Sequence, residues 1–330
     1  MEFTRRQLLI GGASSIATLG AARASYNVVL GYDSFTGTNL IHQDLDPLVR
    51  ENLSLRDGPL GTIDGHHIEL VEDDMTIEAP SGSTFRVPLD MDSLDRAHEV
   101  ERQLDLKDSV LADLNTGLRS VDHGAVNFEY LSYRAFFDRI RSHQPRPLLV
   151  QALRSGRRAE RTSVERFVGI DPAWTPFLVK ALADAFREHT KYDTTRYLAG
   201  SVEDNVIFGV ADLRSPFESP TDFEALAEGE NSGMFCYELV FRSIEAFQTV
   251  PATEQLAPVF AGYVRNSRHK HAFTILGSVI ERDGELEVPV TFIDYTRSTL
   301  YDDLRLRGII GEGLDAYHTR QRATEIRWSY

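Results

Sequence analysis

The chain has 330 residues, 42% of them hydrophobic, and carries a formal net charge of −15 at pH 7. This length and composition allow one large domain or two ordinary domains, each with a buried core. The acidic charge argues against a nucleic-acid partner. Cys236 is the only cysteine, so an internal disulfide is excluded and the thiol must serve either chemistry or packing.

The basic residues are unevenly divided. Only four of the 35 are lysines, and the rest are arginines. A lysine-poor, acidic composition is typical of proteins adapted to high salt and points to a halophilic archaeon as the source. A GC-rich genome would also favour arginine codons. Carboxylates are so common in such a chain that acidic runs are weak evidence for metal sites.

The first 24 residues have the pattern of an export signal. Thr4-Arg5-Arg6-Gln7-Leu8-Leu9 leads into an apolar run that ends at Ala22, and Ala22-Arg23-Ala24 has the small-residue pattern of a cleavage site. We predict a twin-arginine signal peptide over residues 1–24, cleaved before Ser25. No later stretch approaches the roughly 20 apolar residues of a spanning helix. The mature protein is therefore expected to be soluble and to lie outside the membrane, either extracellular or at the cell surface, meeting the membrane only during export.

The first half of the mature chain has a mixed pattern. Short strands are predicted over 26–30, 67–72 and 84–89, and helices over 94–118 and 130–141. The proline-containing stretch 144–147 indicates a break. We therefore expect a mixed α/β region of unassigned role over 25–150 and a second domain over 151–330.

The second domain is expected to begin with helices. Asp171-Pro172 is a favourable N-cap and first helical residue before an apolar helical stripe that ends at Phe186. Turn chemistry at 229–233 offers Asn231 or Ser232 as the N-cap of a later helix. Apolar residues at helical spacing follow, so Cys236 is predicted to lie in the first turn of that helix.

Three strands are predicted after this helix, over 259–264, 271–276 and 288–294. Asp283-Gly284 is a two-residue hairpin turn between the last two. Such a turn pairs Phe273 with Asp294, and it places His271 and Asp294 on one face as diagonal neighbours, with Cα atoms roughly 7–8 Å apart. A slip of one residue would separate them to opposite faces.

Cys236, His271 and Asp294 can therefore be assigned as nucleophile, base and orienting carboxylate. A helix N-terminus and a neighbouring imidazolium both favour a thiolate, and an aspartate fixes the imidazole tautomer that accepts the thiol proton. The assignment requires the helix to pack against the hairpin. Each residue also has an ordinary structural role open to it, as a buried thiol, a satisfied histidine or a strand-end cap.

Residues 161–299 resemble the transglutaminase-like superfamily, which shares the papain-like cysteine-protease architecture. The resemblance rests on Cys236 at a helix start, His271-Ala272-Phe273 opening a strand and Asp294-Tyr295-Thr296 closing the next, with Ser219-Pro220-Thr221, Gly229 and Gly262-Tyr263-Val264 at matching places. The chain departs from the usual Gly-x-Cys, His-Ala-Trp and Asp-Pro-Thr signatures through the position of Gly233 and through Phe273 and Tyr295.

The resemblance implies an α+β fold, in which a papain/transglutaminase-like domain with N-terminal helices and an antiparallel sheet follows the mixed N-terminal region. It also implies acyl transfer through a thioester on a protein or peptide substrate. Water as acceptor would make the chain a peptidase or amidase, and an amine would make it a transglutaminase. The alternative is a non-catalytic binding or structural module at the cell surface. No cofactor or metal is assigned, because neither His269 with His271 nor His66 with His67 has a recognised ligand spacing.

Overall fold

The computed structural model describes residues between 40 and 296, with gaps, and a short C-terminal stretch. The described residues are 40, 42–106, 110–143, 148–154, 157–193, 195–196, 199, 203, 210–229, 232–268, 271–282, 285–296 and 322–328. The predicted signal peptide over 1–24 and the predicted strand over 26–30 lie outside them.

The protein has a mixed α+β fold, as expected. The α-helices of the described part are α3 (Asp46–Glu51), α4 (Leu94–Leu104), α5 (Val110–Asp122), α6 (Tyr133–Ser142), α7 (Arg161–Val168), α8 (Thr175–His189), α10 (Phe223–Glu228) and α11 (Cys236–Gln248). The strands are β1 (Gly58–Ile63), β2 (His66–Val71), β3 (Asp74–Glu78), β4 (Thr84–Pro88), β5 (Val126–Tyr130), β6 (Thr190–Tyr192), β7 (Ser232–Met234), β8 (Phe260–Asn266), β9 (His271–Gly277), β10 (Ile280–Arg282), β11 (Glu285–Ile293) and β12 (Glu325–Arg327). None of the helices in this part of the chain combines the length and apolar character needed to cross a membrane.

A six-stranded sheet forms the middle of the molecule. Its order is β10-β11-β9-β8-β12, and β5 pairs with β11 on the other side of that strand. All of these pairs are antiparallel except β5 with β11. Every residue of β9 is buried, which is the pattern of a strand covered on both faces.

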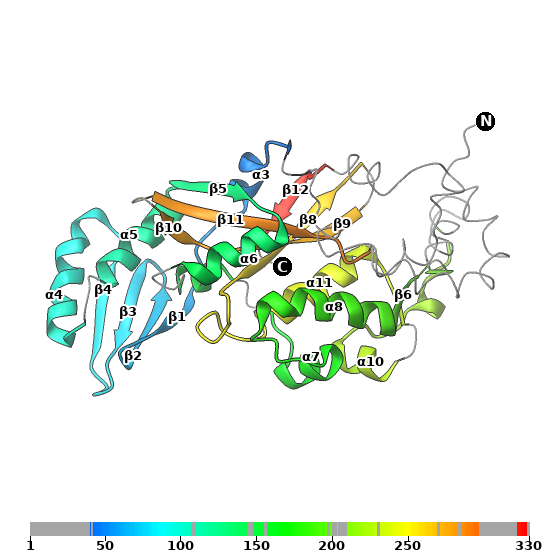
Figure 1. Ribbon diagram of the computed structural model, residues 1–330, viewed down its shortest axis with the longest axis horizontal. Coiled ribbons are helices and arrows are strands. Elements are labelled where there is room, and N and C mark those ends of the chain that lie inside the picture. Colours follow the sequence, from blue (N-terminus) through cyan, green and yellow to red (C-terminus); the bar gives the residue numbers. More distant parts are fainter. Residues whose placement is uncertain are drawn as a thin grey trace.

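Two hydrophobic clusters cover the two faces of this sheet. One face packs with residues of β1–β4, α4 and α5, which we call the N-terminal layer. The other face packs with residues of α6, α7, α8, α10 and α11, which we call the helical layer. Figure 1 shows the N-terminal layer at one end of the molecule, and α7, α8, α10 and α11 of the helical layer at the other end. The catalytic candidate Cys236 belongs to the helical layer.

The N-terminal layer contains a four-stranded antiparallel meander, β1-β2-β3-β4. The predicted strands over 67–72 and 84–89 are confirmed as β2 and β4. The helical pattern predicted over 94–118 is confirmed, and it forms two helices, α4 and α5. Asp105 ends α4 in a left-handed conformation with φ 53°. The buried Glu101 carboxylate then accepts hydrogen bonds from the amides of Leu111 and Ala112, at 2.6 and 3.0 Å, and so caps α5.

The segment 126–142 connects the two halves of the chain. It provides β5, which lies parallel to β11 from Val126 opposite Leu286 to Tyr130 opposite Val290, and then α6, which packs into the helical layer. The helix predicted over 130–141 is confirmed with a later start. The expected division after residue 150 stays a prediction, and elements from both sides of it share one sheet.

The helix predicted to begin at Asp171-Pro172 begins later, at Thr175. Trp174 occupies the N-cap position. The Asp171 carboxylate instead accepts a hydrogen bond from the amide of Ala173 at 2.9 Å and forms an ion pair with Arg161 at 2.6 Å. Asp171 therefore closes a turn before the helix. Its side chain is occupied by this turn and does not cap α8.

Candidate active site

The thiol of Cys236 lies at the first position of α11. Phe235 is the N-cap, with an extended backbone at φ −94° and ψ 164°. The predicted first-turn placement of Cys236 is confirmed, but the predicted N-cap is wrong. Ser232 lies in β7, which pairs with β6 and keeps the chain extended to Met234, and Asn231 lies outside the described residues. The first amides of a helix have no carbonyl partner within it, so the N-terminus of α11 presents donors and partial positive charge beside the thiol.

His271 and Asp294 form a buried pair on the sheet. His271 opens β9, and its Nε2 lies 2.9 Å from Oδ2 of Asp294, the residue directly after β11. The other carboxylate oxygen of Asp294 accepts a hydrogen bond from the amide of Thr296 at 3.1 Å. Because Asp294 occupies Nε2, Nδ1 is the imidazole nitrogen left for the thiol.

The register of the hairpin is the predicted one. Thr274 pairs with Ile293, and Arg282 pairs with Glu285, which is the pairing that a two-residue turn at 283–284 gives. The turn residues themselves lie outside the described part. The strand predicted over 271–276 is confirmed as β9, and the short strand β10, which was not predicted, lies between it and the turn.

The helix that carries Cys236 is joined to the sheet by a buried pair of hydroxyl groups. α11 packs against β8 and β9, and Oγ of Ser243 lies 2.6 Å from Oγ1 of Thr274. Cys236 lies seven residues, about two helical turns, before Ser243 on the same face of α11. The Cys236 side chain shares a hydrogen bond with His271 at the start of β9.

The environment of His271 favours its protonated form. Burial alone would lower the pKa of His271, but the charge and hydrogen bond of Asp294, followed by the hydrogen bond and charge of Cys236, raise it to about 10. The imidazolium is thus expected to persist at neutral pH. An imidazolium in contact with a cysteine favours the reactive thiolate.

The two aromatic residues that depart from the family signatures are both core residues. The Phe273 ring centre lies 5.9 Å from that of His271 and 6.3 Å from that of Phe292. The Tyr295 ring meets Phe186 edge-on at 5.4 Å. Phe273 therefore supports the imidazole by packing, and Tyr295 joins the strand end after Asp294 to α8.

An ion-pair cluster that was not predicted from the sequence lies at the start of α11, the helix that opens with Cys236. The Glu238 carboxylate accepts a hydrogen bond from the amide of Phe235 at 2.6 Å and forms an ion pair with Arg196. Arg196 also contacts Asp193. The position of Glu238 three residues after the N-cap is a known helix-start signal, whereas nothing local in the sequence indicates its pairing with Arg196.

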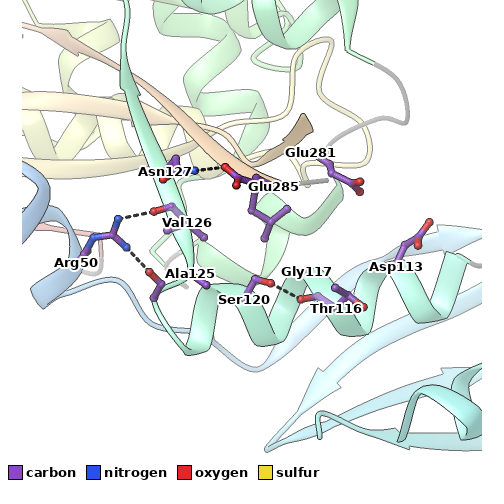
Figure 2. A pocket seen from close by; sticks show the side chains of 12 residues that line it. Arg50, Asp113, Thr116, Gly117, Ser120, Ala125, Val126, Asn127, Glu281 and Glu285 are labelled. Atoms are coloured by element: carbon purple, nitrogen blue, oxygen red, sulfur yellow. Dashed lines mark hydrogen bonds between the residues drawn. The ribbon is translucent and has the colours of Figure 1, made fainter. Parts of the chain in front are cut away.

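A separate hollow of about 570 Å³ lies between α5, β5, β10 and β11 (Figure 2). Its lining contains no member of the Cys236, His271 and Asp294 set. The Asp113 and Glu281 carboxylates face it, and Asn127 donates to Glu285 at 2.9 Å on its wall. Burial, followed by Glu281 and Glu101, raises the pKa of Asp113, against the opposing effect of His98.

No group of three or more histidine, cysteine, aspartate or glutamate side chains in the described residues is arranged to hold a metal ion. His269, one of the histidines considered from the sequence, lies outside those residues.

The described residues thus place a thiol, an imidazole and a carboxylate in one contact series at the junction of α11, β9 and β11. A comparison with protein-family models, a search of curated proteins and a search of solved structures each found no match to the chain.

Proposed function

We propose that this chain is an exported cysteine-dependent amide hydrolase or acyltransferase with a papain/transglutaminase-like domain, acting on protein or peptide amides outside the cell membrane. The observation that carries the proposal is the series of contacts from Cys236 to His271 to Asp294, on the helix start and two strand ends where such a triad needs them. The order of the three residues in the chain and the α+β setting support the same architecture. Export rests on the twin-arginine pattern of residues 1–24.

The proposed acylation starts with the proton on His271. The Cys236 sulfur attacks the amide carbonyl carbon and forms a C–S bond, while the carbonyl π electrons move to the oxygen. The amide of Cys236 at the start of α11 is one donor for that oxyanion. Collapse of the intermediate breaks the C–N bond, and the leaving nitrogen takes the proton from His271. The products are a thioester and a free amine.

Deacylation reverses these roles. Water or an acceptor amine attacks the thioester carbonyl and passes its proton to His271, and breaking the C–S bond restores the thiolate beside the imidazolium. Asp294 stays ionised throughout. It holds Nε2 of the imidazole, so that Nδ1 faces the thiol and the substrate.

A second candidate function is a non-catalytic binding or structural module. The observation in its favour is the low exposure of Cys236, 7%. In that case Cys236 would act as a small core residue of the helical layer, and its replacement by serine would change stability alone.

Alkylation of the native protein separates these two functions. Because Cys236 is the only cysteine, the mass gained on treatment with iodoacetamide reports one site. A catalytic triad predicts rapid labelling near neutral pH, which falls at least about tenfold in His271→Ala through loss of the imidazolium. Labelling that occurs only after denaturation, or that is indifferent to His271, would reject the triad.

The reaction itself is tested with a generic protein substrate. Incubation with casein, with and without a fluorescent primary amine, distinguishes the acceptors, because water yields new amino termini and the amine yields fluorescent casein. Cys236→Ser is the matched control, since it replaces the nucleophilic sulfur and keeps the size of the side chain. Either product should disappear in that variant.

A further inference from the structure

An arginine from a distant part of the chain is buried at the start of α11, the helix that opens with Cys236. Arg196 is 5% exposed, and its guanidinium forms an ion pair with Glu238 in the first turn of α11. Its Nε lies 3.4 Å from Oδ2 of Asp193, and its own amide donates to Oδ1 of Asp193 at 2.8 Å. One guanidinium is therefore shared by the buried carboxylate of Asp193 and the half-buried carboxylate of Glu238, and the rigid donor set of arginine is suited to hold both.

The same guanidinium rests on the residue before the nucleophile. Cζ of Arg196 lies 4.1 Å from the ring centre of Phe235, and the amide of Phe235 is held by Glu238 at 2.6 Å. Arg196 thus contacts both the ring of the N-cap residue and the carboxylate that holds its backbone. This arrangement restricts the entry of the chain into α11, and with it the position of the Cys236 backbone.

Backbone pairing joins the two segments as well. β6 lies parallel to β7, with Lys191 opposite Gly233, and the amide of Asp193 donates to the carbonyl of Met234 at 3.2 Å. A Cβ atom on Gly233 would lie 2.5 Å from Oδ2 of Asp193. Glycine at 233 therefore lets the Asp193 carboxylate approach closely enough to reach Arg196.

The charges near the thiol make this arrangement relevant to reactivity. In the described residues Cys236 interacts with His271, which Asp294 holds, on the sheet side. On the helix side the neighbouring residue Tyr237 is affected by the charges of Glu238, Arg196, Cys236 and Glu218. Glu238 lies two residues from the sulfur, and its negative charge opposes a thiolate there.

These charges act in opposite directions on the pKa of Tyr237, the residue that follows Cys236. Burial raises the pKa of Tyr237, and Glu238 and Cys236 raise it further, whereas Arg196 lowers it. The guanidinium therefore acts electrostatically at the position that adjoins the nucleophile.

We infer that Arg196 is a positioning residue for the nucleophile: it fixes the Phe235–Cys236 backbone at the start of α11 and offsets the Glu238 charge that would otherwise oppose the thiolate. The inference rests on the proposed role of Cys236. Its parts are separable, because the backbone contact depends on the shape of the guanidinium and the charge offset depends on its sign.

The test is the pH dependence of iodoacetamide labelling in the full chain. Arg196→Gln should move the labelling midpoint upward by about one pH unit, and so slow labelling about tenfold below the midpoint. Arg196→Gln combined with Glu238→Gln should move the midpoint back toward that of the unmodified chain, because the opposing carboxylate is gone as well. Arg196→Lys should keep the midpoint close to its original value, because it keeps the charge.

Arg157, which lies outside α11 but contacts it, provides a matched control. Its Nε donates to Glu245 at 2.7 Å, and its Cζ lies 5.0 Å from the ring centre of Phe241, so it repeats the carboxylate and aromatic contacts of Arg196 further along α11. Arg157→Gln should leave the labelling midpoint unchanged.

Two outcomes would overturn the inference. One is an unchanged midpoint in Arg196→Gln, and the other is a double variant as slow as the single one, which would mean that Arg196 has only a structural role. These outcomes differ from failure of the proposed function, in which labelling would be indifferent to His271 in the unmodified chain. If Arg196→Gln does not fold, two other variants decide. Glu238→Gln should lower the labelling midpoint, because it removes the opposing charge. A raised labelling midpoint in Arg196→Lys would overturn the inference.

Discussion

Replacing Ser243 by alanine should lower the free energy of unfolding by about 2 kcal/mol. The Ser243 hydroxyl donates to the carbonyl of Val240 at 2.7 Å and lies 2.6 Å from Oγ1 of Thr274. Since its one proton goes to Val240, Thr274 must donate to Ser243. Alanine therefore removes the hydrogen bond and leaves the buried Thr274 hydroxyl without its acceptor. Urea denaturation, read as a shift in midpoint at constant slope, measures the change.

The direction of this hydrogen bond makes the two partners unequal. Thr274→Val leaves Ser243 bonded to Val240 and should cost only about 1 kcal/mol, and the double variant should cost less than the sum of the single ones. Ser142→Ala is the control, because the exposed Ser142 hydroxyl makes the equivalent bond to the carbonyl three residues earlier, that of Arg139, at 3.1 Å and its loss should change little. A larger loss in Thr274→Val than in Ser243→Ala, or strict additivity, would refute the assigned direction.

Four further outcomes are expected. Asp294→Asn should slow iodoacetamide labelling at pH 7 about tenfold or more by removing the charge that holds the imidazolium, and a wild-type rate would contradict the triad. The raised pKa of His271, about 10, contributes stability that is complete below its ordinary value of 6.5 and is lost as the pH rises toward 10; urea midpoints across this range should flatten in His271→Ala. Gly233→Ala should cost about 1–3 kcal/mol, measured by urea denaturation, because its Cβ would lie 2.5 Å from Asp193. Arg154 is 4% exposed, and burial, followed by a nearby arginine, lowers its pKa to about 9; Arg154→Met should leave stability unchanged or raise it, and a clear loss in a thermal melt would show that the buried charge is stabilising.

The sequence was most informative where structure is local. A two-residue turn at 283–284 fixes which residues face each other, and for this reason the pairing of Thr274 with Ile293 and the contact between His271 and Asp294 could be predicted. The apolar spacing after Cys236 likewise predicted a helix that starts there.

Other features depend on contacts between distant segments and could not be predicted in this way. α11 starts at Cys236 because β7 pairs with β6, which precedes it by about 40 residues, so the nearer N-cap candidate Ser232 was taken up by a strand. Arg196 finds Glu238 only in the folded chain. The sequence also gave no sign that β5 would join β11 in parallel.

That parallel pairing bears on how the protein can be divided. β5 covers an edge of β11, the strand that leads directly to Asp294, and α6 follows it into the helical layer. A fragment that starts at residue 151 would carry all three triad residues, yet it would expose the backbone of β11 along residues 286–290. Open strand edges of this kind invite pairing between molecules. A fragment that keeps this edge of β11 paired therefore has to begin before Val126.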